Sequence, residues 1–133
     1  SHIIDSEEIL VKTLKLNHRI PCNGFLFCSK ENQKISYGYC SDTSYLPELC
    51  ESLKDVNILY HESTFLSQHD YLAKKTKHST ATEAAKIAQT SNANKLILGH
   101  FSARYKDLNK FKNEAISIFS NTFIAKEGQV YSF

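Results

Sequence analysis

The chain has 133 residues, of which 41% are hydrophobic and 23% charged, and its formal net charge is +2. This composition is typical of a globular protein, so we expect residues 1–133 to form one domain or part of a larger one. No apolar stretch approaches the roughly 20 residues of a membrane span, and no signal segment opens the chain, so neither membrane insertion nor secretion is indicated.

The four cysteines contain no C-x-x-C pair of the kind found in zinc ribbons. Three of them lie in or beside apolar runs, where a reduced thiol usually fills the core. We therefore expect a protein of the reducing cytoplasm without disulfides.

The chain has no methionine, so residue 1 is not an initiator and we expect residues to precede it.

Apolar runs of strand length alternate with helical patterns along the chain. We expect strands at 9–18, 23–29, 35–40, 56–61, 95–99, 122–126 and 129–133, with turns at Pro21–Gly24 and Glu127–Gly128 and a polar connection at 30–34. We expect helices at 45–54, 80–91 and 107–119, and an irregular or helical stretch at 65–76. This alternation favours an α/β architecture with helices covering at least one face of the sheet.

The clearest of these elements is the helix at 80–91. Thr80 can cap its first turn, and Glu83 three residues later completes the pattern of a capping box. The alanines at 81, 84, 85 and 88 form a face of small side chains that can pack closely on a sheet.

Four of the apolar runs end on residues that bind metals or transfer protons. These residues are His18, Asp42, the pair His61-Glu62, and His100. In α/β folds, side chains that follow strands emerge at the carboxyl edge of the sheet, where ligands bind. Imidazole and carboxylate groups gathered there would suit zinc.

Asp42 has two interpretations. It can cap the following helix or form an Asx turn, or its two carboxylate oxygens can bridge two metal ions. His100 and His18 are likewise either ordinary polar residues at strand ends or metal ligands. Their common position at strand ends favours the metal hypothesis.

Glu62 and His78 indicate proton transfer. Glu62 follows a strand that we expect to be buried, so desolvation should raise its pKa unless the carboxylate is paired. A carboxylate that orients an imidazole makes a general acid, and phosphodiester cleavage needs one for the departing oxygen. His78, just before the helix at 80–91, is the candidate partner, although it can equally be an exposed residue before a cap.

The basic residues favour an anionic substrate. The only two arginines, Arg19 and Arg104, follow His18 and His100 closely, and arginine binds phosphate with two parallel hydrogen bonds. The free N–H groups at Ser79-Thr80 offer an anion site at the start of a helix. Lysines at 74, 75 and 77 add a basic patch or simply a solvated face, and a polynucleotide backbone is a plausible partner.

In their order along the chain, five motifs resemble ribonuclease Z, the tRNA 3′-processing endonuclease of the metallo-β-lactamase superfamily. They are Leu16-Asn17-His18-Arg19-Ile20-Pro21 with Gly24-Phe25, Cys40-Ser41-Asp42-Thr43, His61-Glu62-Ser63-Thr64, His78-Ser79-Thr80 with Glu83-Ala84-Ala85, and Gly99-His100-Phe101-Ser102-Ala103-Arg104-Tyr105. The resemblance spans roughly residues 9–126, and it implies an αββα sandwich of which this chain is the carboxyl-terminal half. Ser63 stands where the family often has alanine.

The resemblance also implies roles for individual residues. His18 and His100 would each bind one of two zinc ions, and Asp42 would bridge them. Glu62 and His78 would protonate the leaving 3′-oxygen. Arg104 and the loop Ser79-Thr80 would lie near the scissile phosphate or the acceptor end of precursor tRNA.

Two features of the family are missing from the chain. One is the His-x-His-x-Asp-His motif of the amino-terminal half, which contributes further zinc ligands and the aspartate that activates water. The other is the long arm that grips tRNA, because only a short polar connection lies between Gly24 and Asp42. We therefore expect this chain to supply part of an active site and to be inactive alone, with the amino-terminal half and a second copy as its protein partners.

Three other functions fit the sequence. A different phosphodiesterase or hydrolase of the superfamily would keep the metal residues and change the substrate. Two histidines and a carboxylate can also hold a single iron ion. Alternatively, the chain could be a catalytically silent half-domain that binds RNA or forms dimers.

Overall fold

The computed structural model describes residues 2–31 and 35–133, whose strands form one seven-stranded mixed sheet. The strands are β1 (His2–Asp5), β2 (Ile9–Lys15), β3 (Asn23–Ser29), β4 (Ser36–Cys40), β5 (Ile58–Glu62), β6 (Lys95–Gly99) and β7 (Thr122–Ile124). The helices are α1 (Leu49–Ser52), the 3-10 turn η1 (Ser67–His69), α2 (Asp70–Thr76), α3 (Ala81–Thr90) and α4 (Asn109–Ile116). None of these helices has the length and apolarity that a membrane span requires.

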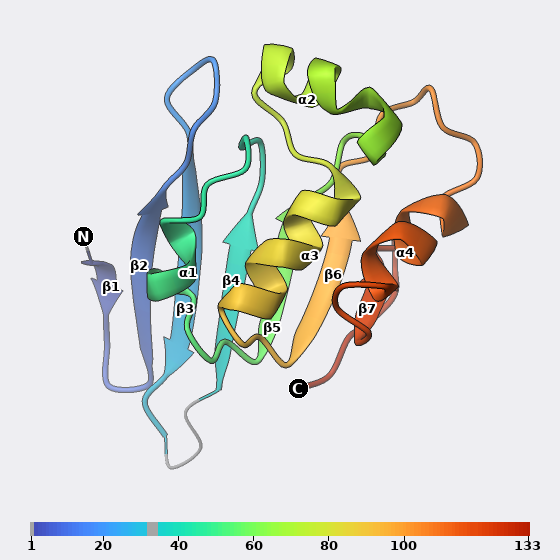
Figure 1. Cartoon of the computed structure of the whole chain (residues 1–133). Coiled ribbons are helices and arrows are strands. Elements are labelled where there is room, and N and C mark those ends of the chain that lie inside the picture. The colour runs from blue at the N-terminus through green and yellow to red at the C-terminus, as the bar shows by residue number, and fades with distance from the viewer. Residues whose placement is uncertain (1, 32–34) are drawn as a thin grey trace.

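The strands follow their sequence order across the sheet. β1 to β4 pair antiparallel, whereas β4 to β7 pair parallel through crossovers that contain the helices. Because successive parallel crossovers of one hand that advance in one direction leave their helices on one side, α1, α3 and α4 share a face of the sheet. Figure 1 shows this single helical layer, with α2 beyond the edge where β4, β5 and β6 end.

The core lies between this helical layer and the sheet. Leu26, Cys40, Leu59, Leu96 and Leu98 project from the strands toward the helices and are buried. α3 packs against them closely because its alanine face is fully buried, and the predicted capping box is confirmed. Thr80 Oγ1 accepts from the Glu83 N–H at 3.2 Å, and Glu83 Oε2 accepts from the Thr80 N–H at 2.9 Å.

The opposite face of the sheet carries aromatic side chains at alternate strand positions. Phe25 and Phe27 on β3, Tyr37 and Tyr39 on β4, and Tyr60 on β5 form a continuous row with ring centroids 4.9–6.5 Å apart. These rings are half-buried, and no described helix lies over them. This face is therefore suited to packing against another layer.

Most predicted elements are confirmed, but several boundaries are wrong. The helices predicted at 45–54 and 107–119 shrink to Leu49–Ser52 and Asn109–Ile116. The short strand β1 was not predicted. Part of the connection expected at 30–34 lies outside the described residues.

The turn predicted at Pro21–Gly24 is also misplaced, because Asn23 and Gly24 open β3. Glycine at position 24 allows β3 to lie close to β4, because a Cβ there would be only 2.6 Å from the Tyr39 carbonyl oxygen. The second strand of the closing pair, 129–133, is absent from the described fold. The turn at Gly128 forms, with φ +74°, but beyond it Val130 is 87% exposed and Tyr131 bonds through its hydroxyl to the Ile124 carbonyl.

Phe111 anchors α4 and the loop that precedes it. Its ring is fully buried and meets Phe101 and Tyr105 edge-to-face at centroid distances of 4.7 and 5.0 Å. We predict that Phe111→Ala in the full-length protein costs about 3–5 kcal/mol of unfolding free energy, measured by chemical denaturation. The matched change Phe133→Ala, at a position 66% exposed, should cost less than about 1 kcal/mol. Equal losses would refute the anchoring role.

The cysteines are free thiols, as predicted. Cys40 is fully buried, and burial raises its pKa to about 12. Because the thiolate is the reactive form, we predict that iodoacetamide at pH 8.5 leaves Cys40 unmodified in the folded protein and alkylates it after denaturation. Mass spectrometry of the Cys40 peptide measures both rates. Comparable rates in the folded and unfolded states would contradict the burial of this thiol.

Candidate metal and proton-transfer site

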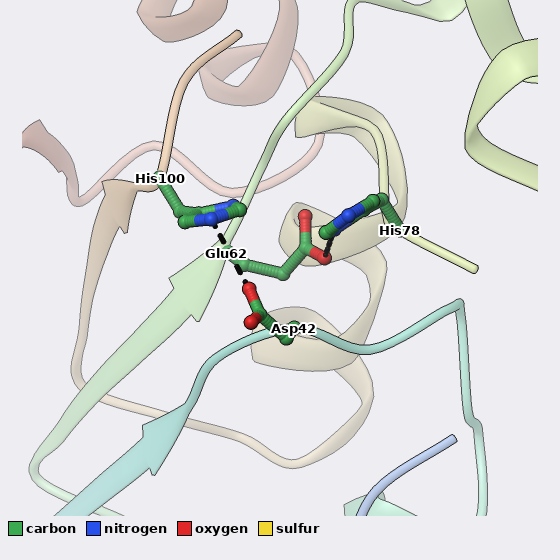
Figure 2. A group of neighbouring side chains, drawn as sticks. All are labelled: Asp42, Glu62, His78 and His100. Carbon is green, nitrogen blue, oxygen red and sulfur yellow. Dashed lines mark hydrogen bonds and ion pairs between the residues drawn. The ribbon is translucent and has the colours of Figure 1, made fainter. Parts of the chain in front are cut away.

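The parallel strands β4, β5 and β6 bring three candidate residues to one edge. Cys40 pairs with His61 and Glu62 with Gly99, so the ends of these strands are level. Asp42, Glu62 and His100 therefore emerge side by side. His78 reaches the same place from the loop between α2 and α3, and Figure 2 shows the four side chains converging. Among the described residues, one potential ligand atom from each lies within 4.8 Å of the others.

Two of these residues adopt a left-handed backbone. Asp42 has φ +49° and His100 has φ +59°, each just after its strand. Residues other than glycine seldom occupy this region, and such strain tends to occur at functional sites. The turn aims both side chains toward each other. Asp42 does not cap a helix, because α1 begins only at Leu49.

A ring nitrogen of His100 faces a carboxylate oxygen of Asp42. The Thr64 hydroxyl donates to Glu62 Oε2 at 2.8 Å, so its oxygen accepts from the His100 Nδ1–H at 2.9 Å. In the tautomer that carries its proton on Nδ1, the Nε2 atom of His100 is an acceptor, and it lies 3.1 Å from Asp42 Oδ1. Oδ1 is buried and finds no hydrogen-bond donor among the described residues. Two bare acceptors at this separation require a cation that binds both, either a proton or a metal ion.

His18 lies beside this group but outside it. Its Nδ1 is 2.9 Å from the Lys77 carbonyl oxygen, and its ring centroid is 4.8 Å from that of His78. Metal-binding histidines are commonly held by a hydrogen bond from Nδ1–H to a backbone carbonyl oxygen, because Nε2 is then free to coordinate the metal. Lys77 itself is left-handed, with φ +56°.

The metal-binding side chains provide some, but not all, of the ligands of a zinc site. His18, Asp42 and His100 provide two imidazole nitrogens and a carboxylate, which is a ligand set that zinc accepts. Three protein donors do not saturate one tetrahedral ion, and they cannot saturate two. A dinuclear site would therefore need ligands beyond these three residues.

Glu62 is the most heavily bonded side chain of the site. It is fully buried, and five donors among the described residues point at its oxygens. Oε1 accepts from the Thr43 N–H and from His78 Nδ1, and Oε2 accepts from the Thr64 N–H, the Thr64 hydroxyl and the Ser79 N–H. With its oxygens so occupied, the Glu62 carboxylate holds neighbouring groups in place and is poorly suited to bind a metal.

The Glu62–His78 pair sets the proton position on His78. Burial by itself would raise the pKa of Glu62, but the hydrogen bond and charge of His78, together with the other donors, bring that pKa below its usual value. The hydrogen bond from His78 Nδ1 to Glu62, at 2.6 Å, raises the pKa of His78, although burial and Arg19 oppose it. His78 Nδ1 is thus fixed, and Nε2 can carry a proton toward a substrate.

Ser79 and Thr80 act within the protein. The Ser79 N–H bonds to Glu62 and its hydroxyl to the Thr43 carbonyl, while the Thr80 N–H bonds to Glu83. Both residues are buried. These groups are therefore not free to bind an anion in this structure, and their contact with substrate stays a prediction.

Arg104 is exposed and rests on Phe65. Its guanidinium carbon lies 5.5 Å from the Phe65 ring centroid, within the range of a cation–π contact, and the same ring lies 6.4 Å from that of His78. Arg104 Nε is 3.4 Å from the Ser102 hydroxyl. Phe65 therefore contacts both Arg104 and His78.

Two residues of the site could not be singled out from the sequence. Thr64 links Glu62, His78 and His100 through one hydroxyl, and Thr43 contributes an N–H to Glu62. Threonines after strands are common, so only the fold distinguishes these two. His61 is fully buried like its neighbour Glu62, but its Nδ1 lies 2.7 Å from the Glu62 carbonyl oxygen, and it is not among the four converging side chains of the described residues.

Comparison with known proteins identifies relatives of one kind. No protein-family model matches the chain. Ribonuclease Z of Cytophaga hutchinsonii is 36% identical over 98% of the chain and 56% of that protein. Ribonuclease Z of Bacteroides thetaiotaomicron is 34% identical over 94% of the chain and 54% of that protein. The chain spans about half the length of these curated relatives.

These alignments run over 176 and 171 residues, although the chain has 133. The relatives therefore carry additional residues inside the matched region.

Solved structures agree on the fold. The short form of human tRNase Z superposes with a TM-score of 0.81 and 28% identity, covering 98% of the chain and 46% of that protein. A metallo-β-lactamase fold protein from Bacillus subtilis gives a TM-score of 0.88 at 23% identity, covering 98% and 52%, which supports the fold alone. The predicted fold class is confirmed. By sequence and fold, the chain belongs with the carboxyl-terminal half of the ribonuclease Z family, in the metallo-β-lactamase superfamily.

Proposed function

We propose that this chain forms part of the active site of a zinc-dependent endoribonuclease that removes the 3′ trailer from precursor tRNA. The observation that carries the proposal is the approach of His100 Nε2 to Asp42 Oδ1 at 3.1 Å, where the buried Oδ1 has no hydrogen-bond donor among the described residues. The names of the relatives, ribonuclease Z and tRNase Z, supply the substrate class. A cytoplasmic location and a homodimer stay predictions.

In the proposed site, His18, Asp42 and His100 hold zinc together with ligands from the rest of the full-length protein. Bound zinc supplies Lewis-acid stabilisation and lowers the pKa of water. Asp42 is the candidate bridge between two ions, because its two oxygens can bind one ion each. His18 presents Nε2 since its Nδ1 bonds to the Lys77 carbonyl.

His78 acts on the leaving group. Its Nδ1–H is held by Glu62 at 2.6 Å, so a proton on Nε2 can pass to the 3′-oxygen of the tRNA as the phosphorus–oxygen bond breaks. Water adds to phosphorus, and the products are a tRNA with a 3′-hydroxyl and a trailer with a 5′-phosphate. Arg104, whose guanidinium contacts the Phe65 ring, would bind a phosphate oxygen with its fork of N–H groups.

The direct test is cleavage of precursor tRNA by the zinc-loaded full-length protein. We predict a tRNA product ending in a 3′-hydroxyl, and a loss of several orders of magnitude in kcat/KM for Asp42→Ala, because the bare His100 nitrogen loses its partner and the ions lose a ligand. Glu127→Ala, in an exposed turn, is the control for loss of an acidic group.

Near-normal turnover of Asp42→Ala would refute the bridging role. Cleavage of a small chromogenic phosphodiester without cleavage of precursor tRNA would instead assign the site to another phosphodiesterase of the superfamily. RNA binding by a protein that holds no metal would favour the silent half-domain.

A separate prediction concerns the proton-transfer pair Glu62 and His78. We predict that Glu62→Gln and His78→Ala each lower kcat by about 10²–10⁴-fold and that the double variant is no worse than either, because the two side chains act as one unit. Single-turnover kinetics on precursor tRNA measure the three losses, and zinc content checks that the metal site survives. Losses that multiply in full would show that the two residues act separately.

A further inference from the structure

A cavity of about 340 Å³ adjoins the site at His78, and its lining comes from α2 and the residue that ends it, from α3, and from the loops after β2 and β4. His78 lines this cavity as well as the metal site, so the two spaces share a wall. The volume falls at the lower end of the about 300–1,000 Å³ of small-molecule pockets. None of the roles assigned above uses this cavity.

We propose that the cavity binds one nucleotide of the RNA substrate, the one next to the scissile phosphate. The assignment rests on the proposed function, because it takes His78 as the group nearest the reacting phosphate. A nucleotide combines a flat base, hydrogen-bonding edges and an anionic phosphate. The lining offers a complement to each of these parts.

Tyr45 is the complement to the base. Tyr45 lines the cavity and is 38% exposed, so the residue is accessible to a ligand there. Two hydrogen bonds hold the loop just before Tyr45. The Ser44 N–H donates to the Asn17 carbonyl at 2.9 Å, and the Thr43 N–H donates to the buried Glu62 carboxylate. A rigid, half-open aromatic ring is the usual platform on which single-stranded bases stack.

Lysines are the complement to the phosphate, Lys77 in particular, because the Lys74 Nζ is already paired with Asp70 at 3.1 Å. Lys74 and Lys77 both line the cavity, whereas Lys75 on the same helix does not. Lys77 occupies the left-handed position that ends α2, where glycine is the usual residue, so the fold carries a strained lysine at the cavity wall. Its carbonyl oxygen also holds His18, which ties the cavity to the metal site.

Glu83 and Asn17 are the complement to the base edge. Glu83 Oε2 accepts from Thr80, while Oε1 accepts none of the hydrogen bonds found among the described residues and can take an amino or imino proton. The Asn17 side chain offers a donor and an acceptor in the same cavity. Together these groups favour a base over a purely anionic ligand.

The test uses the zinc-loaded full-length protein and a chromogenic phosphodiester, bis(p-nitrophenyl) phosphate, which contains no base. The probes are cytidine, uridine, adenosine and guanosine 5′-monophosphates as competitive inhibitors, with inorganic phosphate for comparison. We expect at least one nucleotide to inhibit more strongly than phosphate. Tyr45→Ala should raise the inhibition constant of that nucleotide about tenfold, the loss of one stacked base, and leave inhibition by phosphate unchanged.

Two matched controls keep the result specific. Tyr71→Ala removes an exposed tyrosine from α2 that does not line the cavity, and Lys75→Ala is the counterpart of Lys77→Ala. We expect Lys77→Ala, but neither control, to weaken nucleotide inhibition. Calorimetric titration of the nucleotide into metal-free protein should give the same ranking of variants.

Unchanged inhibition constants in Tyr45→Ala and Lys77→Ala, or nucleotides that bind no better than phosphate, would overturn the proposal. The outcome is independent of the tRNA assignment. If the wild-type protein fails to cleave precursor tRNA, the proposed function falls, while the inhibition series still decides whether the cavity holds a nucleotide.

Discussion

The buried carboxylate of Glu62 is the constraint on which the site depends. A buried anion is stable only when its oxygens are paired, and here the donors come from the loop after β4, the end of β5 and the loop before α3. Satisfying one charge therefore fixes three loops relative to one another. Those loops carry Asp42 and His78 directly, and Thr64 extends the same network to His100. The arrangement of the site follows from a single desolvated charge.

Two features of the chain support the proposal that it supplies only part of a reaction centre. Its crossovers place every covering helix on one face of the sheet, which leaves a row of five half-buried aromatic rings on the other, within the described residues. At the sheet edge, His18, Asp42 and His100 offer fewer donors than zinc requires. A second layer would cover the open face and could complete the ligand set, and nearly half of each relative lies outside the matched region.

Local patterns predicted the parts of this structure that depend on local forces. The helix that begins after Thr80 carries its own capping box, and the strands before Asp42 and His100 are apolar runs with polar ends. Features that depend on distant partners could not be predicted. These are the short strand β1, the start of β3 at Asn23-Gly24 in place of a turn, and the segment around Val130, which joins no strand. In the site, Asp42, Glu62, His78 and His100 converge because three parallel strands end level, which the sequence only suggests. The bonding role of Thr64 needs coordinates, since nothing distinguishes its hydroxyl along the chain.

We propose that Asp42 and His100 bind a metal ion together, whereas Glu62 binds none. The decisive measurement is anomalous diffraction at the zinc absorption edge, from crystals of the full-length protein. Zinc should lie about 2.0–2.2 Å from His100 Nε2 and an Asp42 oxygen, with a second ion at His18 Nε2 and no zinc bound to Glu62. Zinc bound to Glu62, or a proton alone between Asp42 and His100 with no anomalous peak, would contradict this proposal.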